Sequence, residues 1–176
     1  FTDEDRSYKE LFDSKFLHKK EILVEKICEN NPRADEIRAF CKRVRNQSDI
    51  ERTSSESEKE GIFTGYHVIN PFNGQKAQLW ITNYVLYDYG TGAVMGVPSG
   101  DQRDWMFATK YGIDIILTLQ PKDRELKLEE MTAAYVEKEG VLVNSDKFTG
   151  MEMHAAMKAI IDEAEIQGFG KRRVNY

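Results

Sequence analysis

Hydrophobic residues recur at helical spacing in the first third of the chain. The stretch KKEILVEKICE (residues 19–29) has the apolar content of a helix, which the Asn-Asn-Pro sequence at 30–32 would end. A second helix is predicted over 34–47, where four apolar residues fall at i, i+3, i+4 and i+7. The residues on this face are Ile37, Phe40, Cys41 and Val44.

The pattern changes to one typical of strands over residues 62–97, which are rich in β-branched and aromatic side chains. Apolar residues occupy both faces of 77–86, as in a strand buried between two layers, and NPFNG (70–74) predicts a turn before it. AVMGVP (93–98) predicts a further short buried strand. Strands are also predicted at 114–121 and 141–145.

Three later segments have helical character. Residues 101–112 predict about three turns ending at Gly112, residues 126–140 are moderately helical, and residues 153–165 form an amphipathic pattern. The mixture predicts an α/β or α+β fold whose strands are mostly not joined as hairpins. The last helix would bury Met153, Met157, Ile160, Ile161 and Ala164.

The composition is that of one globular domain. The chain has 176 residues, 40% of them hydrophobic and 31% charged, and contains no apolar run long enough to span a membrane. We expect a single domain with an atypical N-terminal segment (1–20), a helical part (21–60) and a mixed strand and helix core (61–176). The net charge of −5 argues against an extensive nucleic-acid-binding surface. It does not argue against binding a small part of a nucleic acid.

Cysteine and histidine usage predicts neither a disulfide nor a metal site. Cys28 and Cys41 both fall within helical patterns, which favours free buried thiols and a reducing compartment. His18, His67 and His154 lie far apart in the sequence and lack Cys or Glu partners at ligand spacing.

Two aspartates at the start of the predicted 101–112 helix are the main candidates for chemistry. Ser99 or Asp101 would cap the helix, and with Asp101 as the N-cap Asp104 lies in the first turn, where the helix dipole favours the ionised carboxylate. A carboxylate fixed there, beside Met95 and Val97, suits a cationic group such as a free amine. The alternative is that both aspartates only cap the helix.

Long stretches of the sequence resemble the editing domain of bacterial-type leucyl-tRNA synthetase. They are SDIERT, followed by GIFTGYHVINPFNGQKAQLWITNYVLYDYGTGAVMGVPSGDQRDWMFATKYG, then GVLVNS with FTGM, and GFGKRRVNY at the end. The resemblance covers roughly residues 36–176 in the family's order. It implies the class I synthetase editing-domain fold, with a mixed β-barrel-like core surrounded by helices.

The resemblance implies proofreading by hydrolysis of the ester that joins norvaline, isoleucine or methionine to tRNA(Leu). Asp104 would hold the α-ammonium group of the amino acid, with Asp101 also in the substrate site. Met95 and Val97 would line the amino-acid pocket. The terminal adenosine and the ester would face Leu86, Tyr89, Gly90 and Thr91.

The resemblance also implies the surroundings of the reaction. This domain would need no cofactor or metal, because water attacks the ester. ATP and Mg would serve leucine attachment in a separate synthetic domain of the parent enzyme. The partners would be the 3′ end of aminoacylated tRNA(Leu) and the remainder of the synthetase. We expect a monomer, without membrane contact, in the cytoplasm or an organelle.

Two departures from the family pattern bear on hydrolysis. The family has Ala-His-Asp or Gly-His-Asp where this chain has Ser99-Gly100-Asp101, so the histidine is replaced by glycine. The family's loop Thr-Thr-Arg-Pro-Asp-Thr would fall near FTDEDRSYKE (residues 1–10), where only Thr2 and Ser7 keep a hydroxyl. These departures favour a degenerate hydrolytic site.

Alternative interpretations therefore stay open. One is a non-catalytic module that contacts tRNA or serves as a spacer and keeps the fold without the chemistry. Another is a free-standing relative that acts in trans, although the abrupt ends at Phe1 and Tyr176 favour an excised fragment.

Overall fold

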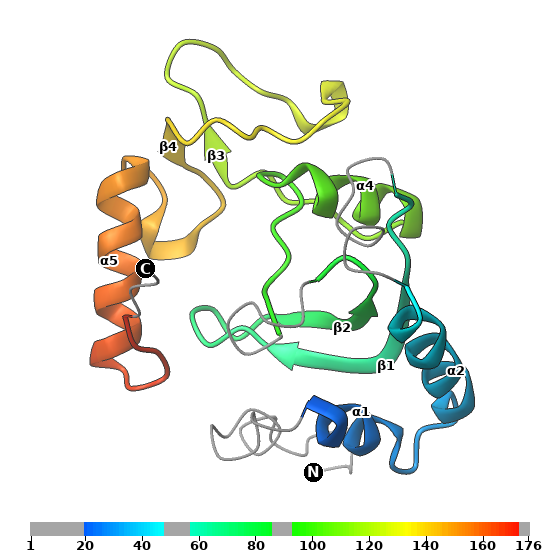
Figure 1. The fold of residues 1–176 in the computed structure, drawn as a ribbon. Helices are drawn as coiled ribbons and strands as arrows, with labels where there is room; N and C mark the ends of the chain where they lie inside the picture. Colours follow the sequence, from blue (N-terminus) through cyan, green and yellow to red (C-terminus); the bar gives the residue numbers. More distant parts are fainter. Residues whose placement is uncertain (1–19, 48–56, 86–92, 173–176) are drawn as a thin grey trace. The chain divides into compact units, whose positions relative to one another are not determined.

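The computed structural model describes residues 20–47, 57–85 and 93–172 (Figure 1). The chain divides into two compact units, residues 1–95 and residues 96–176. The first contains α1, α2, β1 and β2, and the second contains α4, β3, β4 and α5.

Both helices predicted for the first unit are confirmed. α1 spans Lys20–Cys28 and α2 spans Ala34–Arg45. The connection between them includes Asn30 in the left-handed conformation, with φ 56°. The predicted apolar face of α2 is turned inward, since Ile37, Phe40 and Val44 are buried and Cys41 is half-buried.

β1 (Gly61–Ile69) and β2 (Lys76–Thr82) form an antiparallel hairpin, with Gly61 opposite Thr82 and Ile69 opposite Lys76. The predicted turn at 70–74 is confirmed, because Asn70 N–H donates to Gln75 O and Gly74 N–H donates to Asn70 O, both at 2.8 Å. One expectation is wrong, because β2 is not buried between layers and none of its residues is fully buried.

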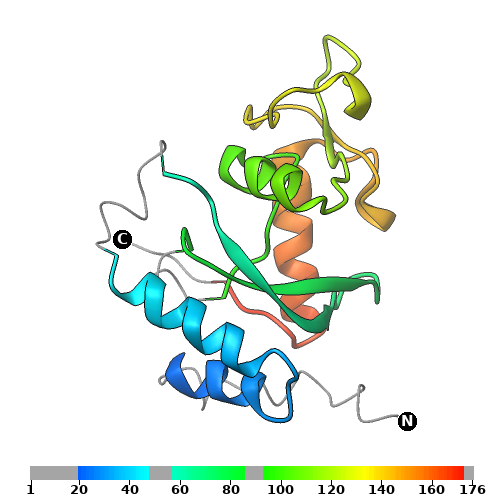
Figure 2. The same ribbon diagram turned by 90° about the vertical axis from the view of Figure 1, so that its right-hand side faces the viewer.

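The core of the first unit lies where α1 and α2 pack against one face of this hairpin (Figure 2). Ile27, Cys28 and Ile37 form its centre, and residues Ile62, Tyr66, Leu79 and Ile81 of the strands pack against them. The buried Asn31 side chain joins helix to sheet, because its Nδ2 donates to Ile27 O at 3.0 Å and to Thr64 O at 2.8 Å.

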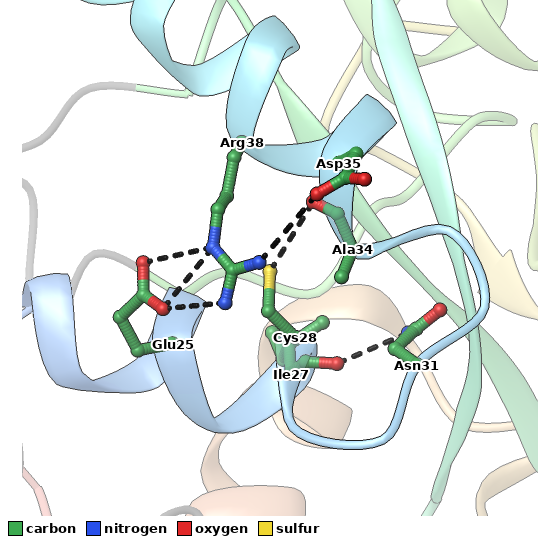
Figure 3. A network of polar contacts seen from close by, with 7 residues as sticks. All are labelled: Glu25, Ile27, Cys28, Asn31, Ala34, Asp35 and Arg38. Atoms are coloured by element: carbon green, nitrogen blue, oxygen red, sulfur yellow. Dashed lines mark hydrogen bonds and ion pairs between the residues drawn. The ribbon is translucent and has the colours of Figure 1, made fainter.

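A polar network links α1 to α2 on the outside of this core (Figure 3). The Arg38 guanidinium lies 2.8 Å from a Glu25 carboxylate oxygen and 3.9 Å from Asp35. The Cys28 thiol faces Ala34 O at 3.8 Å, and both cysteines are free, as predicted. Burial raises the pKa of the Cys28 thiol and that of the Cys41 thiol, so both favour the unreactive protonated form.

The second unit contains α4 (Gln102–Tyr111), β3 (Leu119–Gln120), β4 (Val141–Leu142) and α5 (Met153–Ile166). β3 and β4 pair antiparallel, with Gln120 opposite Val141 (Figure 1). The predicted helices at 101–112 and 153–165 are confirmed. Gly112 ends α4 in the left-handed conformation, with φ 64°.

Four predictions for this part of the chain are wrong in extent or kind. Residues 93–98 form no strand, the helix expected at 126–140 is reduced to one 3-10 turn at Leu128–Glu130, and the strands expected at 114–121 and 141–145 contract to two residues each. Short apolar runs are ambiguous from periodicity alone, and their regularity depends on a partner strand.

The buried hydrophobic residues of the second unit come from both helices and from the segments between them, which contribute Leu117, Tyr135, Leu142 and Phe148. Trp105, Phe107 and Ala108 of α4 are buried, and Ala156 is the buried residue of α5. On the predicted face of α5, Met157 is 47% exposed, whereas Met153, Ile160, Ile161 and Ala164 are half-buried. The described residues give two two-stranded antiparallel sheets, one in each unit. No helix among the described residues is long and apolar enough to cross a membrane.

Candidate functional site

Asp101 is the N-cap of α4, as the sequence predicts. Its backbone is extended, and its Oδ1 accepts hydrogen bonds from Arg103 N–H at 2.8 Å and from Asp104 N–H at 3.3 Å. The Arg103 guanidinium also lies 3.1 Å from Asp101 Oδ2. The cap satisfies two of the amides that a helix leaves without intrahelical partners.

These contacts set the charge state of Asp101. Partial burial alone would raise the pKa of its carboxyl, but the hydrogen bonds from the Arg103 side chain and from the amides of Asp104 and Arg103 outweigh it. The pKa of Asp101 is therefore lowered, and the carboxylate is ionised at neutral pH.

Asp104 lies in the first turn of α4, half-buried, and its carboxylate is held by the main chain. Asp104 Oδ2 accepts from Val97 N–H at 2.8 Å, seven residues earlier. Val97 O in turn accepts from Gly100 N–H at 2.8 Å and from Asp101 N–H at 2.9 Å. Residues 97–104 thus form a closed turn in which the carboxylate of Asp104 is fixed beside an apolar segment.

Long-range contacts that the sequence does not reveal support this turn. Ser99 is buried, its hydroxyl lies 3.2 Å from the Thr118 hydroxyl, and its carbonyl accepts from Tyr135 N–H at 2.9 Å. Gln102 Oε1 accepts from Ala134 N–H at 3.0 Å. No local pattern signals these partners, because they lie 19 to 36 residues away in the chain.

The predicted pocket walls differ from expectation in their exposure. Met95 is 64% exposed and Val97 is 53% exposed, so neither is the buried strand residue that AVMGVP predicts. The segment has no partner strand among the described residues, which leaves its side chains at the surface. Their role in lining a pocket stays a prediction.

The other predicted site residues lie outside the described residues. They are Thr2, Ser7, Leu86, Tyr89, Gly90 and Thr91.

Two other kinds of site are possible in principle among the described residues, namely a metal-binding cluster and a groove at residues 115–144. Among the described residues, no group of three or more His, Cys, Asp or Glu side chains could hold a metal ion. The ring of His67 packs edge-on against Phe63 with centroids 5.6 Å apart, and His154 is exposed on α5. The groove, of about 500 Å³, is lined by residues 115–117, 120, 126–129 and 143–144, none of them predicted as site residues.

Comparison with known proteins places this geometry in a family. The family described as "Leucyl-tRNA synthetase, editing domain" matches residues 15–165. A leucine–tRNA ligase of Symbiobacterium thermophilum is 54% identical over 158 residues, which are 88% of this chain and 18% of that protein. One of Nitratidesulfovibrio vulgaris strain DP4 is 46% identical over 154 residues, again 88% and 18% of the two chains.

A solved structure agrees with these relatives. It is a leucyl-tRNA synthetase of Agrobacterium radiobacter K84 in a ternary complex with tRNA and LeuAMS. It matches with a TM-score of 0.59 and 27% sequence identity, over 84% of this chain and 16% of that one. The chain thus spans less than a fifth of the length of the proteins it matches.

The fold is that of a domain found in an aminoacyl-tRNA synthetase. The chain belongs to the leucyl-tRNA synthetase editing-domain family, as the resemblance in its sequence implies.

Proposed function

We propose that this chain hydrolyses the ester bond of mischarged tRNA(Leu), acting on norvaline, isoleucine or methionine attached to the terminal adenosine. Family membership supports this function, and the fixed Asp104 carboxylate is the observation that carries it. The parent enzyme would be a leucine–tRNA ligase that uses ATP and Mg in its synthetic domain. Proofreading answers a physical limit, because one methylene alters pocket binding by only about 1–3 kcal/mol.

In the proposed reaction, water attacks the carbonyl carbon of the ester. The bond from this carbon to the ribose oxygen then breaks, and the ribose oxygen takes up a proton that the water loses. The products are the free amino acid and uncharged tRNA. No cofactor takes part, and the residues of the chain bind and orient the substrate.

Asp104 would bind the α-ammonium group of the amino acid. Val97 N–H holds one carboxylate oxygen, so the carboxylate is oriented before the substrate binds. A hydrogen bond between two charged groups contributes about 1.5–3 kcal/mol. Met95 and Val97, with more than half of each side chain exposed, are available to contact the amino-acid side chain.

The remaining contacts are proposed from the resemblance. Leu86, Tyr89, Gly90 and Thr91 would face the adenosine and the ester, and Thr2 and Ser7 would supply hydroxyls. The β-barrel-like core also belongs to this proposal. Partners would be the tRNA 3′ end, in keeping with the tRNA in the Agrobacterium complex, and the rest of the synthetase.

A second candidate is a module that contacts tRNA without hydrolysing it. Gly100 favours this candidate, since it provides no side chain where the family has histidine. The two candidates differ in a single observable, which is release of norvaline from norvalyl-tRNA(Leu) above the rate in buffer.

The test compares the 176-residue chain with its Asp104→Asn and Asp104→Ala variants on norvalyl-tRNA(Leu). Asparagine keeps an oxygen for Val97 N–H but removes the charge, so it separates anchoring of the turn from binding of the ammonium. We expect kcat/KM to fall about 10- to 100-fold in both variants.

Asp114→Asn is the matched control, because Asp114 is an exposed aspartate of the same unit. A full rate in Asp104→Asn would contradict the amine anchor. A rate equal to that of buffer in the unaltered chain would leave the non-catalytic module as the function.

A further inference from the structure

A short segment is hydrogen-bonded to the turn that carries Asp104. We name residues 134–139 the strap. Two adjacent strap amides act together, because Ala134 N–H donates to Gln102 Oε1 at 3.0 Å and Tyr135 N–H donates to Ser99 O at 2.9 Å. The acceptors belong to Ser99 and Gln102, which lie before and after the N-cap residue Asp101 in the sequence. The strap therefore contacts the turn on both sides of the N-cap.

The strap itself is fixed in place. Tyr135 is 8% exposed, and its hydroxyl donates to Glu139 O at 2.9 Å and lies 3.2 Å from Glu137 Oε2. The Arg124 guanidinium packs over the Tyr135 ring at 5.7 Å from its centroid and lies 3.5 Å from Glu137. The segment therefore provides a firm support for the turn.

The strap contacts the same residues that determine where Asp104 lies. Ser99 sits inside the turn closed by the bond from Gly100 N–H to Val97 O, and Val97 N–H holds Asp104 Oδ2. Gln102 is the first residue of α4. A shift of Ser99 or Gln102 would move Val97 and the first helical turn together, and with them the carboxylate.

We propose that Gln102 is a positioning residue for Asp104. Its side-chain oxygen binds the strap to the start of α4, and this contact keeps the Asp104 carboxylate in one place. Gln102 acts through the turn and does not touch the substrate. The inference rests on the proposed function for its catalytic consequence, although its structural part is independent of catalysis.

The discriminating variants are Gln102→Ala and Gln102→Glu. Alanine removes the acceptor for Ala134 N–H, whereas glutamate retains an oxygen at the same distance along the side chain. A negative charge at the first position of a helix is also favourable. Val136→Ala is the matched control, because Val136 belongs to the strap and its side chain is 58% exposed.

The first measurement is hydrogen exchange at the Val97 amide, which reports its bond to Asp104. Loss of one supporting hydrogen bond corresponds to about a fivefold to tenfold change in an equilibrium. We expect exchange at Val97 to be faster by about this factor in Gln102→Ala, and unchanged in Gln102→Glu and Val136→Ala.

The second measurement is the release of norvaline from norvalyl-tRNA(Leu). A displaced Asp104 would misalign the ester, so kcat should fall about tenfold in Gln102→Ala with KM altered less than twofold, and Gln102→Glu should restore kcat. Unchanged exchange at Val97 in Gln102→Ala would overturn the proposal. A lower melting temperature with normal exchange and kcat would overturn it too, since Gln102 would then only stabilise the fold.

The two proposals fail in distinguishable ways. If the unaltered chain releases no norvaline, the proposed function is wrong, but hydrogen exchange at Val97 still decides whether Gln102 positions Asp104. If the chain is active and Gln102→Ala matches it in both measurements, the proposed function stands and the positioning role does not.

Discussion

Gly100 lies in the turn between Val97 and the N-cap residue Asp101. The sequence resemblance places a histidine of the editing-domain family at this position. A Cβ atom built on Gly100 would lie 3.9 Å from Val97 O and 4.0 Å from Tyr135 O, which are ordinary contact distances. Its φ angle is also outside the left-handed region that favours glycine. Space and backbone conformation therefore allow a side chain at this position.

We predict that Gly100→His folds and releases norvaline several-fold faster than the unaltered chain. Gly100→Ala is the control for folding, and it should be as stable or up to about 1 kcal/mol more stable, because glycine costs more backbone entropy on folding. Norvaline release and urea unfolding measure the two effects. Unfolding of both variants would show that the turn has no room for a side chain.

At the scale of elements, the positions of the four described α-helices and of the paired strands could be predicted from the sequence, but the lengths of β3 and β4 could not. The face of α2 and both ends of α4 follow from local signals, namely apolar spacing, Asp101 at the N-cap and Gly112 at the C-terminus. The strand expected at 93–98 and the helix expected at 126–140 depend on contacts with distant residues.

The same distinction applies to the candidate site. The placing of Asp101 at the N-cap and of Asp104 in the first turn could be predicted, because capping acts over three or four residues. The bonds from the strap to Ser99 and Gln102 join segments more than 30 residues apart, and no residue pattern indicates them.

Gly140 is required by the pairing of β3 with β4. Its φ is +146°, and a Cβ atom there would lie 2.2 Å from Gln120 O and 2.9 Å from Gln120 C. Neither atom can move without displacing the β3 backbone, and Gly140 O also accepts from Met153 N–H at the start of α5.

We predict that Gly140→Ala lowers the free energy of unfolding by about 2–3 kcal/mol. Thermal denaturation should show a fall in melting temperature of about 5–10 °C. Gly150→Ala is the matched control, since Gly150 also has a positive φ, +88°, but a Cβ atom added there would have no other atom within 4 Å. An equal loss in the two variants would mean that strain, and not the clash with Gln120, sets the cost.

At the scale of the whole molecule, each unit has a core of its own, and the chain carries a net charge of −5. Among the described residues, four carboxylates distributed over both units have pKa values below their ordinary ones. The Arg38 guanidinium lowers the pKa of Glu25, and the Lys147 ammonium with the Gln167 amide lowers that of Glu163. Burial opposes the shift in the other two, but hydrogen bonds outweigh it in Asp101 and Glu152.

We predict that acid destabilises the chain. A carboxyl group with a lowered pKa binds fewer protons folded than unfolded, so its stabilisation is complete above the unfolded pKa of about 4. This stabilisation is lost as the pH falls through the lower folded pKa values. Urea midpoints measured between pH 7 and pH 2.5 should therefore be constant above about pH 5 and fall below about pH 4.

Asp101→Asn is a specific check, because asparagine also caps helices but does not titrate. Its midpoint should resemble that of the unaltered chain at neutral pH and fall less steeply in acid. Identical acid profiles would exclude Asp101 as a contributor.

Val97 holds the Asp104 carboxylate through its backbone N–H and not through its side chain. Any amino acid except proline provides this N–H, so the side chain at 97 can change without loosening the carboxylate. Freezing a free carboxylate on binding would cost about 0.5–1.5 kcal/mol of rotamer entropy, and here that ordering happens when the chain folds. In the proposed editing function, selectivity among amino acids could therefore diverge at residue 97 during evolution, while recognition of the charged nitrogen common to all of them is inherited unchanged.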